Sequence, residues 1–412
     1  MKLYSPFEYL CIDIANAKGL DKLLFEERIA WVTSNIYNLE AYARDADDPA
    51  LYIKAVLAMR QAQAGKPIGH LISLDSVCSG IQVMSALTGC PLGAAATGLI
   101  CPNVRSDAYT EVTKAMNLIL EGRGQEGVTI MRALAKDAVM KAGYGSTAEP
   151  KAIFGEHIDV FNQATLKVAR GAFELMPYLV KSWNKKAMAH SWTMPDGFHV
   201  YLPVVQKEST RLRVDELGGA SVTFKYDVNA PSDYSRSNAA NMIHSVDAMV
   251  LRNMIRRCSY DHEQVANAVA MLESHVFNCL LRGKQPAALA HGLLSKYVNL
   301  YNKSGWCDPV IINVIDEDNV DQLTVEHSQK LLNLLNRMLE NKPFHIITVH
   351  DAFRCLAGNG NVVRYWYKEI LAELAESNVL QYLLTELMGR PIQFKKYADI
   401  AHLIRNSNYS LC

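Results

Sequence analysis

Hydrophobic residues in the first 65 positions recur at intervals of three and four. The segments 6–17, 25–43 and 49–64 have this spacing, and Gly19 and the polar stretch 45–49 interrupt it. Such spacing aligns apolar side chains along one face of an α-helix. The chain is therefore predicted to begin with a group of amphipathic helices.

The same pattern predicts further elements along the chain. "HLISLD" (70–75) has the character of a short strand that ends on Asp75, and a helix over 79–89 follows with Ser79 as its N-cap. Helical spacing continues over 108–144, 157–190 and 236–258. A β-hairpin is predicted over 209–228, turning at Gly218 and Gly219, and two short strands over 344–358.

Residues 262–340 are predicted to be mostly helical, with a short strand at 308–315. No internal repeat or low-complexity linker separates independent units. The pattern as a whole predicts an α+β fold that is mainly helical and interwoven.

Composition and charge narrow the functional classes. Of 412 residues, 50% are hydrophobic, and 42 basic side chains balance 42 acidic ones. Proteins that hold duplex DNA unaided carry excess positive charge, so any nucleic-acid surface here must be local or supplied by a partner. Neither a leader peptide nor an apolar run of about 18 residues is evident, which predicts a cytoplasmic protein without membrane contact. Nine cysteines without CxxC spacing favour reduced thiols over disulfides or zinc.

One helical segment carries a mixed stripe. In "RALAKDAVMKAGYGS", Arg132, Lys136, Met140 and Tyr144 recur every four residues, and Gly145 follows. Two cations, a thioether and a phenol would share a face, while a second stripe of Met131, Leu134, Ala135, Ala138 and Val139 would pack inward. A solvated basic face is the simple interpretation of an Arg-Lys pair alone. The aromatic end favours a nucleoside triphosphate site, where cations neutralise phosphates.

Two aspartates lack a structural reason to be where they are. Asp75 ends one apolar strand, and Asp351 lies at a turn between two others. Each alone is more often a cap or turn residue, but a buried carboxylate needs a partner. Together with the cationic stripe they predict a site for two Mg²⁺ ions, which carboxylates and substrate oxygens hold.

These segments resemble motifs A, B and C of the single-subunit phage and mitochondrial RNA polymerases. "DSVCSGIQ", "RALAKDAVMKAGYGS" and "VHDAF" match in order and spacing, "ANMIHSVDAMVLR" resembles the family's His-Ser-x-Asp segment, and 194–214 resembles the approach to its promoter-contacting hairpin. The resemblance implies a right-hand polymerase with palm and fingers. It divides the chain into the palm start with motif A (1–91), fingers with motif B (92–207), a hairpin like the family's specificity loop (208–230), a helix with His-Ser-x-Asp (231–261), a helical insertion (262–341), and the palm with motif C and a C-terminal foot (342–412).

The resemblance also implies roles for individual residues. Asp75 and Asp351 would bind the two Mg²⁺ ions with the carbonyl of Ser76, although the family usually has glycine at that position. Lys136 would be the general acid that protonates pyrophosphate, helped by burial and neighbouring cations. The remaining nucleotide-binding residues would be Arg132, Lys22, Met140, Tyr144, Gly145, Gly80 and His244, and the nucleic-acid contacts would be Arg211, Arg213, Lys225 and His350.

Gly80 indicates the product. Family A DNA polymerases share the three motifs but carry glutamate five residues after the first aspartate, where it blocks a ribose 2′-hydroxyl. Glycine leaves room for that hydroxyl, and Tyr144 and His244 can hydrogen-bond near it. Ribonucleotides are the predicted substrate, DNA the template and RNA the product.

The family's N-terminal domain, thumb and Asp-x-x-Gly-Arg element are not found in this chain. The layout is most similar to the large catalytic subunit of the split, two-polypeptide RNA polymerases of N-four-like phages, which predicts a companion subunit in the host bacterial cytoplasm. The insertion could dock the companion or a single-stranded-DNA-binding factor, or be purely structural. The hairpin has few cations, so single-stranded or melted template is expected to be preferred.

The sequence is also compatible with three other hypotheses. The chain could be a family A-like DNA polymerase, or a degenerate polymerase fold that only binds nucleic acid. The adjacent His350 and Asp351 could also belong to a metal phosphohydrolase, although such enzymes place these ligands on helices.

Overall fold

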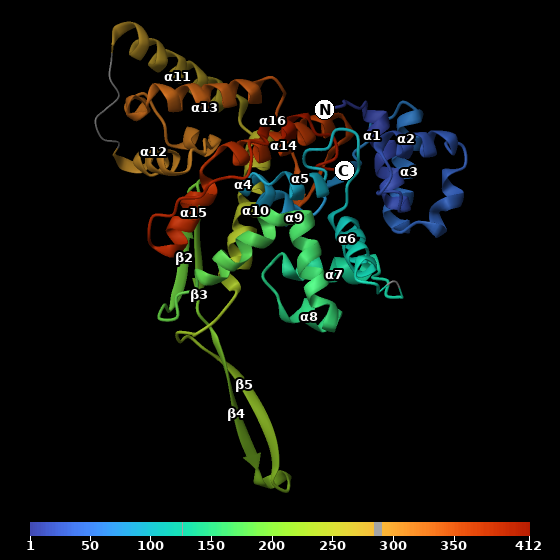
Figure 1. Ribbon diagram of the computed structural model, residues 1–412. Helices are drawn as coiled ribbons and strands as arrows, with labels where there is room; N and C mark the ends of the chain where they lie inside the picture. The colour runs from blue at the N-terminus through green and yellow to red at the C-terminus, as the bar shows by residue number, and fades with distance from the viewer. Residues whose placement is uncertain (126, 284–290) are drawn as a thin grey trace.

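A small antiparallel sheet forms the centre of the computed structural model, which describes residues 1–125, 127–283 and 291–412 (Figure 1). Its three strands have the order β1–β7–β6. They are β1 (Leu71–Asp75), β6 (Ile347–Val349) and β7 (Ala352–Leu356). The register pairs Leu71 with Leu356 and Asp75 with Ala352. The strands predicted at 70–75 and within 344–358 are thereby confirmed.

The N-terminal helices pack beside this sheet. They are α1 (Pro6–Lys18), α2 (Phe25–Ser34) and α3 (Pro49–Gln63). Ser5 and Glu8 form a capping box at the start of α1, and Gly19 ends the helix at a φ of +99°. Asp48 caps α3. Helix α1 contacts α2, α3 and β1, so it connects the other two predicted helices to the sheet.

A second group of helices follows β1. It comprises α4 (Ser79–Thr88), α5 (Pro91–Ala96), α6 (Ala108–Gly122), α7 (Arg132–Ala142), α8 (Ala148–Phe154) and α9 (Ile158–Lys181). The helix predicted over 108–144 is thus two helices rather than one. Cys78, not Ser79, is the N-cap of α4, with a positive φ of 76° and no side-chain cap. Ser79 is instead the first helical residue.

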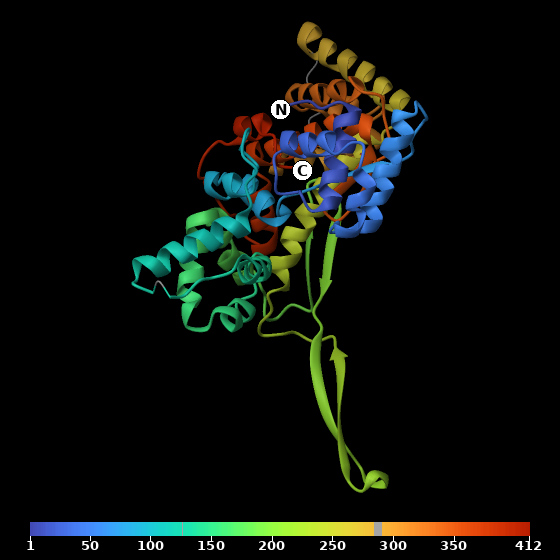
Figure 2. The same cartoon turned by 90° about the vertical axis from the view of Figure 1, so that its right-hand side faces the viewer.

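Two hairpins follow α9. They consist of β2 (Ala189–Thr193) with β3 (His199–Pro203), and β4 (Gln206–Val214) with β5 (Ala220–Val228). The first begins inside the range predicted to be helical, because the helix already ends at Lys181. The second turns at Gly218 and Gly219, both with positive φ, as predicted. It projects far from the body in both views (Figures 1 and 2).

The predicted insertion is helical and lies beside the body. Helix α10 (Ser237–Cys258) leads into α11 (His262–Arg282), α12 (Gly292–Ser304) and α13 (Val325–Leu339). Residues 284–290 of the insertion lie outside the described residues. The strand predicted at 308–315 is wrong: Asp308 caps a short 3₁₀-helix at Pro309–Asn313, since its carboxylate accepts from the amide of Val310. Short apolar runs do not by themselves distinguish strand from helix.

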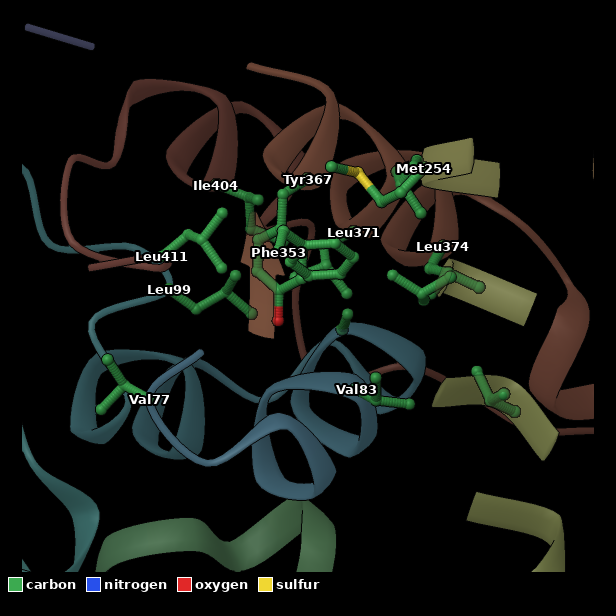
Figure 3. Packing of buried hydrophobic residues seen from close by; sticks show 14 of the residues in the cluster. Val77, Val83, Leu99, Met254, Phe353, Tyr367, Leu371, Leu374, Ile404 and Leu411 are labelled. Carbon is green, nitrogen blue, oxygen red and sulfur yellow. The ribbon is translucent and has the colours of Figure 1, made fainter. Parts of the chain in front are cut away.

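The C-terminal helices close the core. They are α14 (Gly360–Glu376), α15 (Val379–Met388) and α16 (Ala401–Asn406). Phe353 of β7 packs with Tyr367, Leu371 and Leu374 of α14 in the centre (Figure 3). Other labelled members of this cluster come from distant segments: Val77, Val83, Leu99, Met254, Ile404 and Leu411. One shared core therefore joins the sheet to helices from both halves of the chain.

The structure is mostly helical with small sheets, in agreement with the predicted α+β class. None of the helices in the described ranges is both long enough and apolar enough to cross a bilayer.

Candidate active site

The sheet brings the two predicted carboxylates together. Asp75 ends β1 opposite Ala352, and Asp351 immediately precedes Ala352 at the turn from β6. Oγ of Ser76 donates to Oδ2 of Asp351 over 2.5 Å, and its amide donates to the Asp351 carbonyl over 3.3 Å. Residues 276 positions apart in sequence thus share one site.

The turn that presents Asp351 is conformationally unusual. His350 has a φ of +55°, a region that residues other than glycine rarely occupy. A two-residue hairpin turn with positive φ at its first position normally favours glycine there. The flanking pair, Val349 with Ala352, holds the turn in this geometry.

Two other segments fix the end of β1. Asp13 of α1 accepts from the amide of Ser73 over 2.9 Å and lies 2.7 Å from Nε2 of His70. At the opposite side, the amide of Asp75 donates to the carbonyl of Cys412 over 2.9 Å, and the amide of Cys412 donates back over 2.8 Å. The backbone of Asp75 is therefore held between β7 and the C-terminal tail.

The charges at this site repel one another. Desolvation of the carboxylate by the surrounding protein raises the pKa of Asp75 to about 6, and the negative charge of Asp351 adds to the effect. Asp75 nevertheless borders an open hollow, so its carboxylate is accessible from solvent. A cation between the two carboxylates would relieve their repulsion, and hard oxygen donors suit Mg²⁺. Asp75, Asp351 and the Ser76 carbonyl fit such ions, although no cluster of three or more His, Cys, Asp or Glu ligands occurs in the described ranges.

A third carboxylate belongs to the same surroundings. Asp247 of α10 faces the site, and burial followed by the charge of Asp351 raises its pKa to about 7. The sequence placed Asp247 in the His-Ser-x-Asp segment but assigned it no role. Only the folded arrangement shows that it lines a hollow shared with Asp351.

The cationic stripe of α7 forms one wall of a first hollow of about 510 Å³. Arg132, Lys136 and Met140 line it together with Lys22, Asp75 and Asp351. Lys136 is exposed, contrary to the expected burial. Of the stripe expected to pack inward, Met131 and Leu134 are also exposed, and only Ala135, Ala138 and Val139 are buried.

A second hollow of about 570 Å³ adjoins the first. Both are lined by Cys78, Tyr109, Met140 and Asp351, so they form one continuous depression. The predicted residues Gly80, Tyr144, His244 and His350 line the second hollow. The rings of Tyr144 and His244 lie 4.6 Å apart between centroids.

Gly80 faces the phenol of Tyr144. A Cβ built at Gly80 would lie 3.4 Å from Oη of Tyr144, so a longer side chain would meet that hydroxyl. Burial raises the pKa of Tyr144, with Asp247 adding to the effect, so its hydroxyl stays protonated and can donate a hydrogen bond.

Gly145 does not line either hollow. It has a φ of +89° just after α7, and its carbonyl accepts from Nη1 of Arg236 over 2.9 Å. A side chain would be strained at this φ, so the glycine allows the turn after Tyr144, and its contact with a nucleotide stays a prediction.

The hairpin cations line neither hollow, and the hairpin that carries them projects from the body (Figure 2). Arg211 and Arg213 on β4 and Lys225 on β5 project from the same face, because Ser209 pairs with Lys225 and Arg211 pairs with Thr223. The opposite face presents exposed Leu212, Val222, Phe224 and Tyr226. One face of the hairpin is therefore cationic and the other is apolar.

Three residues near the stripe were not anticipated. Arg105, Asp107 and Tyr109 line the first hollow from the start of α6. The Tyr109 ring lies 5.7 Å from the Arg132 guanidinium and 5.9 Å from the Lys136 ammonium. An aspartate before a helix resembles any N-cap, so no local signal distinguishes this turn.

Comparisons with known proteins agree with the motifs. Residues 4–160 match the family described as DNA-dependent RNA polymerase. The chain is 23% identical over 300 residues to the DNA-directed RNA polymerase of Pseudomonas phage phiKMV, which covers 58% of this chain and 36% of that protein. It is 25% identical over 376 residues to the mitochondrial DNA-directed RNA polymerase 1 of Arabidopsis thaliana, a match that covers 76% of this chain and 36% of that protein. It is 24% identical over 339 residues to T7 RNA polymerase of Escherichia phage T7, a match that covers 60% of this chain and 38% of that protein.

The matched segments span little more than a third of the length of these relatives. Residues 4–160, which match the family description, include the strand that ends on Asp75 and helix α7 with its cationic stripe. Sequence similarity and site geometry thus agree: the chain is similar to DNA-directed RNA polymerases of phages and mitochondria over part of their length.

Proposed function

We propose that this chain is the catalytic subunit of a DNA-directed RNA polymerase. One observation carries the proposal: Asp75 and Asp351 meet on paired strands at the base of a hollow whose wall is the cationic face of α7. Carboxylates on one side and cations on the other suit the transfer of a nucleotidyl group from a triphosphate. In this proposal the sheet is the palm and α6–α9 belong to the fingers.

The reaction joins the 3′-hydroxyl of RNA to the α-phosphorus of a ribonucleoside triphosphate. An O–P bond forms as the 3′-hydroxyl releases its proton to water, the bond to the bridging α–β oxygen breaks, and pyrophosphate leaves. Arg132 and Lys22 neutralise the phosphates, and the Lys136 ammonium gives a proton to the departing pyrophosphate oxygen. Two bound Mg²⁺ ions, held by Asp75, Asp351 and the Ser76 carbonyl, would stabilise charge on the attacking and leaving oxygens.

The second hollow is proposed to receive the base and ribose. Tyr144 and Met140 flank the nucleotide, and His244 lies beside Tyr144. The space above Gly80 admits a 2′-hydroxyl, which the Tyr144 hydroxyl can meet. This arrangement favours ribonucleotides over deoxyribonucleotides.

Charge-removing variants test the catalytic assignment. Asp75→Asn and Asp351→Asn are expected to lower nucleotide addition by roughly 10²–10³-fold or more while template binding persists. Asp137→Asn is the control, because Asp137 is exposed on α7 and pairs with Lys141. Unchanged synthesis by both site variants would instead support the hypothesis of a subunit that only binds nucleic acid.

A companion subunit and a single-stranded-DNA-binding factor are part of the proposal. Zero net charge supports them, because this chain offers little excess positive charge for holding DNA. Native co-purification followed by a runoff assay tests the companion, and robust synthesis by the chain alone would contradict it. The same assay should show more initiation on heat-denatured than on duplex template, and equal initiation would refute the template preference.

A further inference from the structure

The carboxylate of Asp107 contacts Arg132, the first cation of the stripe on α7. Its Oδ2 accepts from Nε of Arg132 over 2.7 Å and lies 2.5 Å from Nη2 of the same guanidinium. The Asp107 side chain is 13% exposed, against 39% for Arg132. The anchor is therefore more buried than the group it holds.

Arg132 needs such an anchor because of its position in α7. It is the first residue of the helix, where the helix dipole presents partial positive charge. The first turn contains no acidic residue, and the N-cap Met131 offers no side-chain acceptor. A cation there is disfavoured and rotationally free unless another element binds it.

The first turn of α6 supplies two more contacts. Oγ1 of Thr110 donates to Oδ2 of Asp107 over 2.6 Å and accepts from Nε of Arg132 over 3.0 Å. The Tyr109 ring lies near both Arg132 and Lys136. One helical turn of α6 thus contacts two cations that are one turn apart on α7.

We propose that Asp107 is a positioning residue, which orients the Arg132 guanidinium toward the phosphates of the incoming nucleotide. Asp107 engages Nε and Nη2, whereas no hydrogen bond in the described part of the chain engages Nη1. Nη1 is the group left to meet a phosphate oxygen in the first hollow. This inference rests on the proposed function, because it assumes that the hollow binds a triphosphate.

Two substitutions separate position from charge. Asp107→Asn and Asp107→Ser both remove the negative charge, and both side chains are good helix N-caps. Asparagine keeps an acceptor oxygen at about the reach of the original carboxylate, whereas serine is too short. The Ser variant is expected to have a kcat/KM for ribonucleotides about tenfold below that of the Asn variant. Binding of tripolyphosphate to the purified chain, measured by calorimetry at 0.15 M salt, should weaken by a similar factor.

The Arg132→Ala background shows whether the effect passes through Arg132. There the difference between the Asn and Ser variants should disappear in both measurements. Asp159→Asn and Asp159→Ser are matched controls. Oδ2 of Asp159 lies 2.7 Å from Nη2 of Arg123, which follows the last residue of α6, and this ion pair is exposed. These two should equal each other and the unsubstituted protein.

The outcomes are distinct. Equal kcat/KM and equal binding for the Asn and Ser variants would overturn the positioning role, as would a difference that persists without Arg132. Absence of synthesis by the native complex would refute the proposed function, and the tripolyphosphate measurements would still decide whether Asp107 acts through Arg132.

Discussion

A missing side chain defines the proposed sugar selectivity. Gly80 lies in the first turn of α4 with the Tyr144 hydroxyl 3.4 Å from where its Cβ would be. Gly80→Glu is expected to place a carboxylate over the position of the 2′-hydroxyl. Its kcat/KM for ribonucleotides should fall roughly 10- to 100-fold, with a much smaller change for deoxyribonucleotides. Single-nucleotide extension assays with both sugars measure this ratio.

The control is Gly80→Ala, whose Cβ makes only an ordinary contact with Tyr144. It should lose far less activity than the glutamate variant. Equal losses for both sugars in Gly80→Glu would mean that the residue affects folding or general binding, not the recognition of ribose.

Among single residues, the sequence predicted the charged residues of the candidate site but not the other carboxylates that lie beside them. Asp75 and Asp351 stood out because charges interrupt apolar strands, and Arg132 and Lys136 because of their helical spacing. Asp107 and Asp247 gave no such signal, since an aspartate at or within a helix is ordinary. Their proximity to the site arises from contacts between α6 and α7 and from the position of α10 along the hollow that Asp351 also lines, which no local pattern encodes.

Among the elements, α13 contains a buried imidazole that should make stability depend on pH. The His327 ring stacks on Tyr301 of α12 with centroids 3.7 Å apart. Burial lowers the pKa of His327 to about 4, and Lys330 adds to the effect against the opposing charge of Glu326. The folded state therefore favours neutral histidine, whereas the unfolded chain binds a proton below its ordinary pKa of about 6.5.

The stability that comes from burying neutral His327 is fully present above about pH 6.5 and is lost as the pH falls toward 4. Linkage predicts a loss of about 2 kcal/mol in the free energy of unfolding between pH 7.5 and pH 5 from this group. His327→Phe keeps a stacked ring without the titration, so its loss over the same interval should be smaller by that amount. Urea unfolding at both pH values measures it, and parallel losses in the two proteins would contradict the assignment.

The two faces of the β4–β5 hairpin predict different effects on nucleic-acid binding. Removing the three cations by Arg211→Ala, Arg213→Ala and Lys225→Ala should weaken binding to single-stranded DNA. The slope of log affinity against log salt should become shallower by about 2, because each neutralised phosphate contributes about 0.7. Titrations of the hairpin variants at several salt concentrations provide the slope.

Substitutions on the opposite face are the control. Leu212→Ser and Val222→Ser remove exposed apolar side chains without changing charge, so the salt slope should stay the same. A slope that is equally unchanged in the triple variant would show that these cations do not contact phosphates.

Elements with strong local signals were predicted well, and those decided by tertiary contacts were not. The hairpin turn at Gly218 and Gly219 and the helices of the first 65 residues have their own turn and capping chemistry. The apolar run at 308–315 is β-branched, yet it forms a 3₁₀-helix because Asp308 caps it and bonds Asn253 and Arg256 of α10. The capping partner was visible in the sequence, but the partners on α10 were not.

For the whole molecule, ion pairs join the insertion to the helix behind the candidate site. Glu369 of α14 accepts from Nη1 of Arg337 on α13 over 2.6 Å and from Nε of Arg405 on α16 over 3.0 Å. Glu373, one turn later, accepts from Nη2 of the buried Arg257 on α10 over 2.6 Å. Four helices therefore meet at two carboxylates of α14.

Helix α14 also reaches the second hollow. Tyr367, two residues before Glu369, lines that hollow, and its hydroxyl donates to Oε1 of Gln82 on α4 over 2.6 Å. The predicted insertion is thus connected to the second hollow through α14, in addition to its two chain connections. The predicted insertion could dock a partner or have a structural role, and these contacts favour the structural role.

Glu369→Gln tests this connection. The Glu369 carboxylate is 7% exposed, which makes it more buried than Glu373 and Glu376, the carboxylates that also pair with Arg337 and Arg405. Its loss removes the most buried counter-charge of both arginines, so the free energy of unfolding should fall by about 1–3 kcal/mol. Glu376→Gln is the matched control: the Glu376 side chain is half exposed and forms an ion pair with Arg405, so this substitution should cost less than about 0.5 kcal/mol. Hydrogen exchange should rise in α13 together with α14 and α16 in the first variant, because all three share Glu369. If exchange rises in α14 and α16 but not in α13, the insertion is held by other contacts and the proposed connection is wrong.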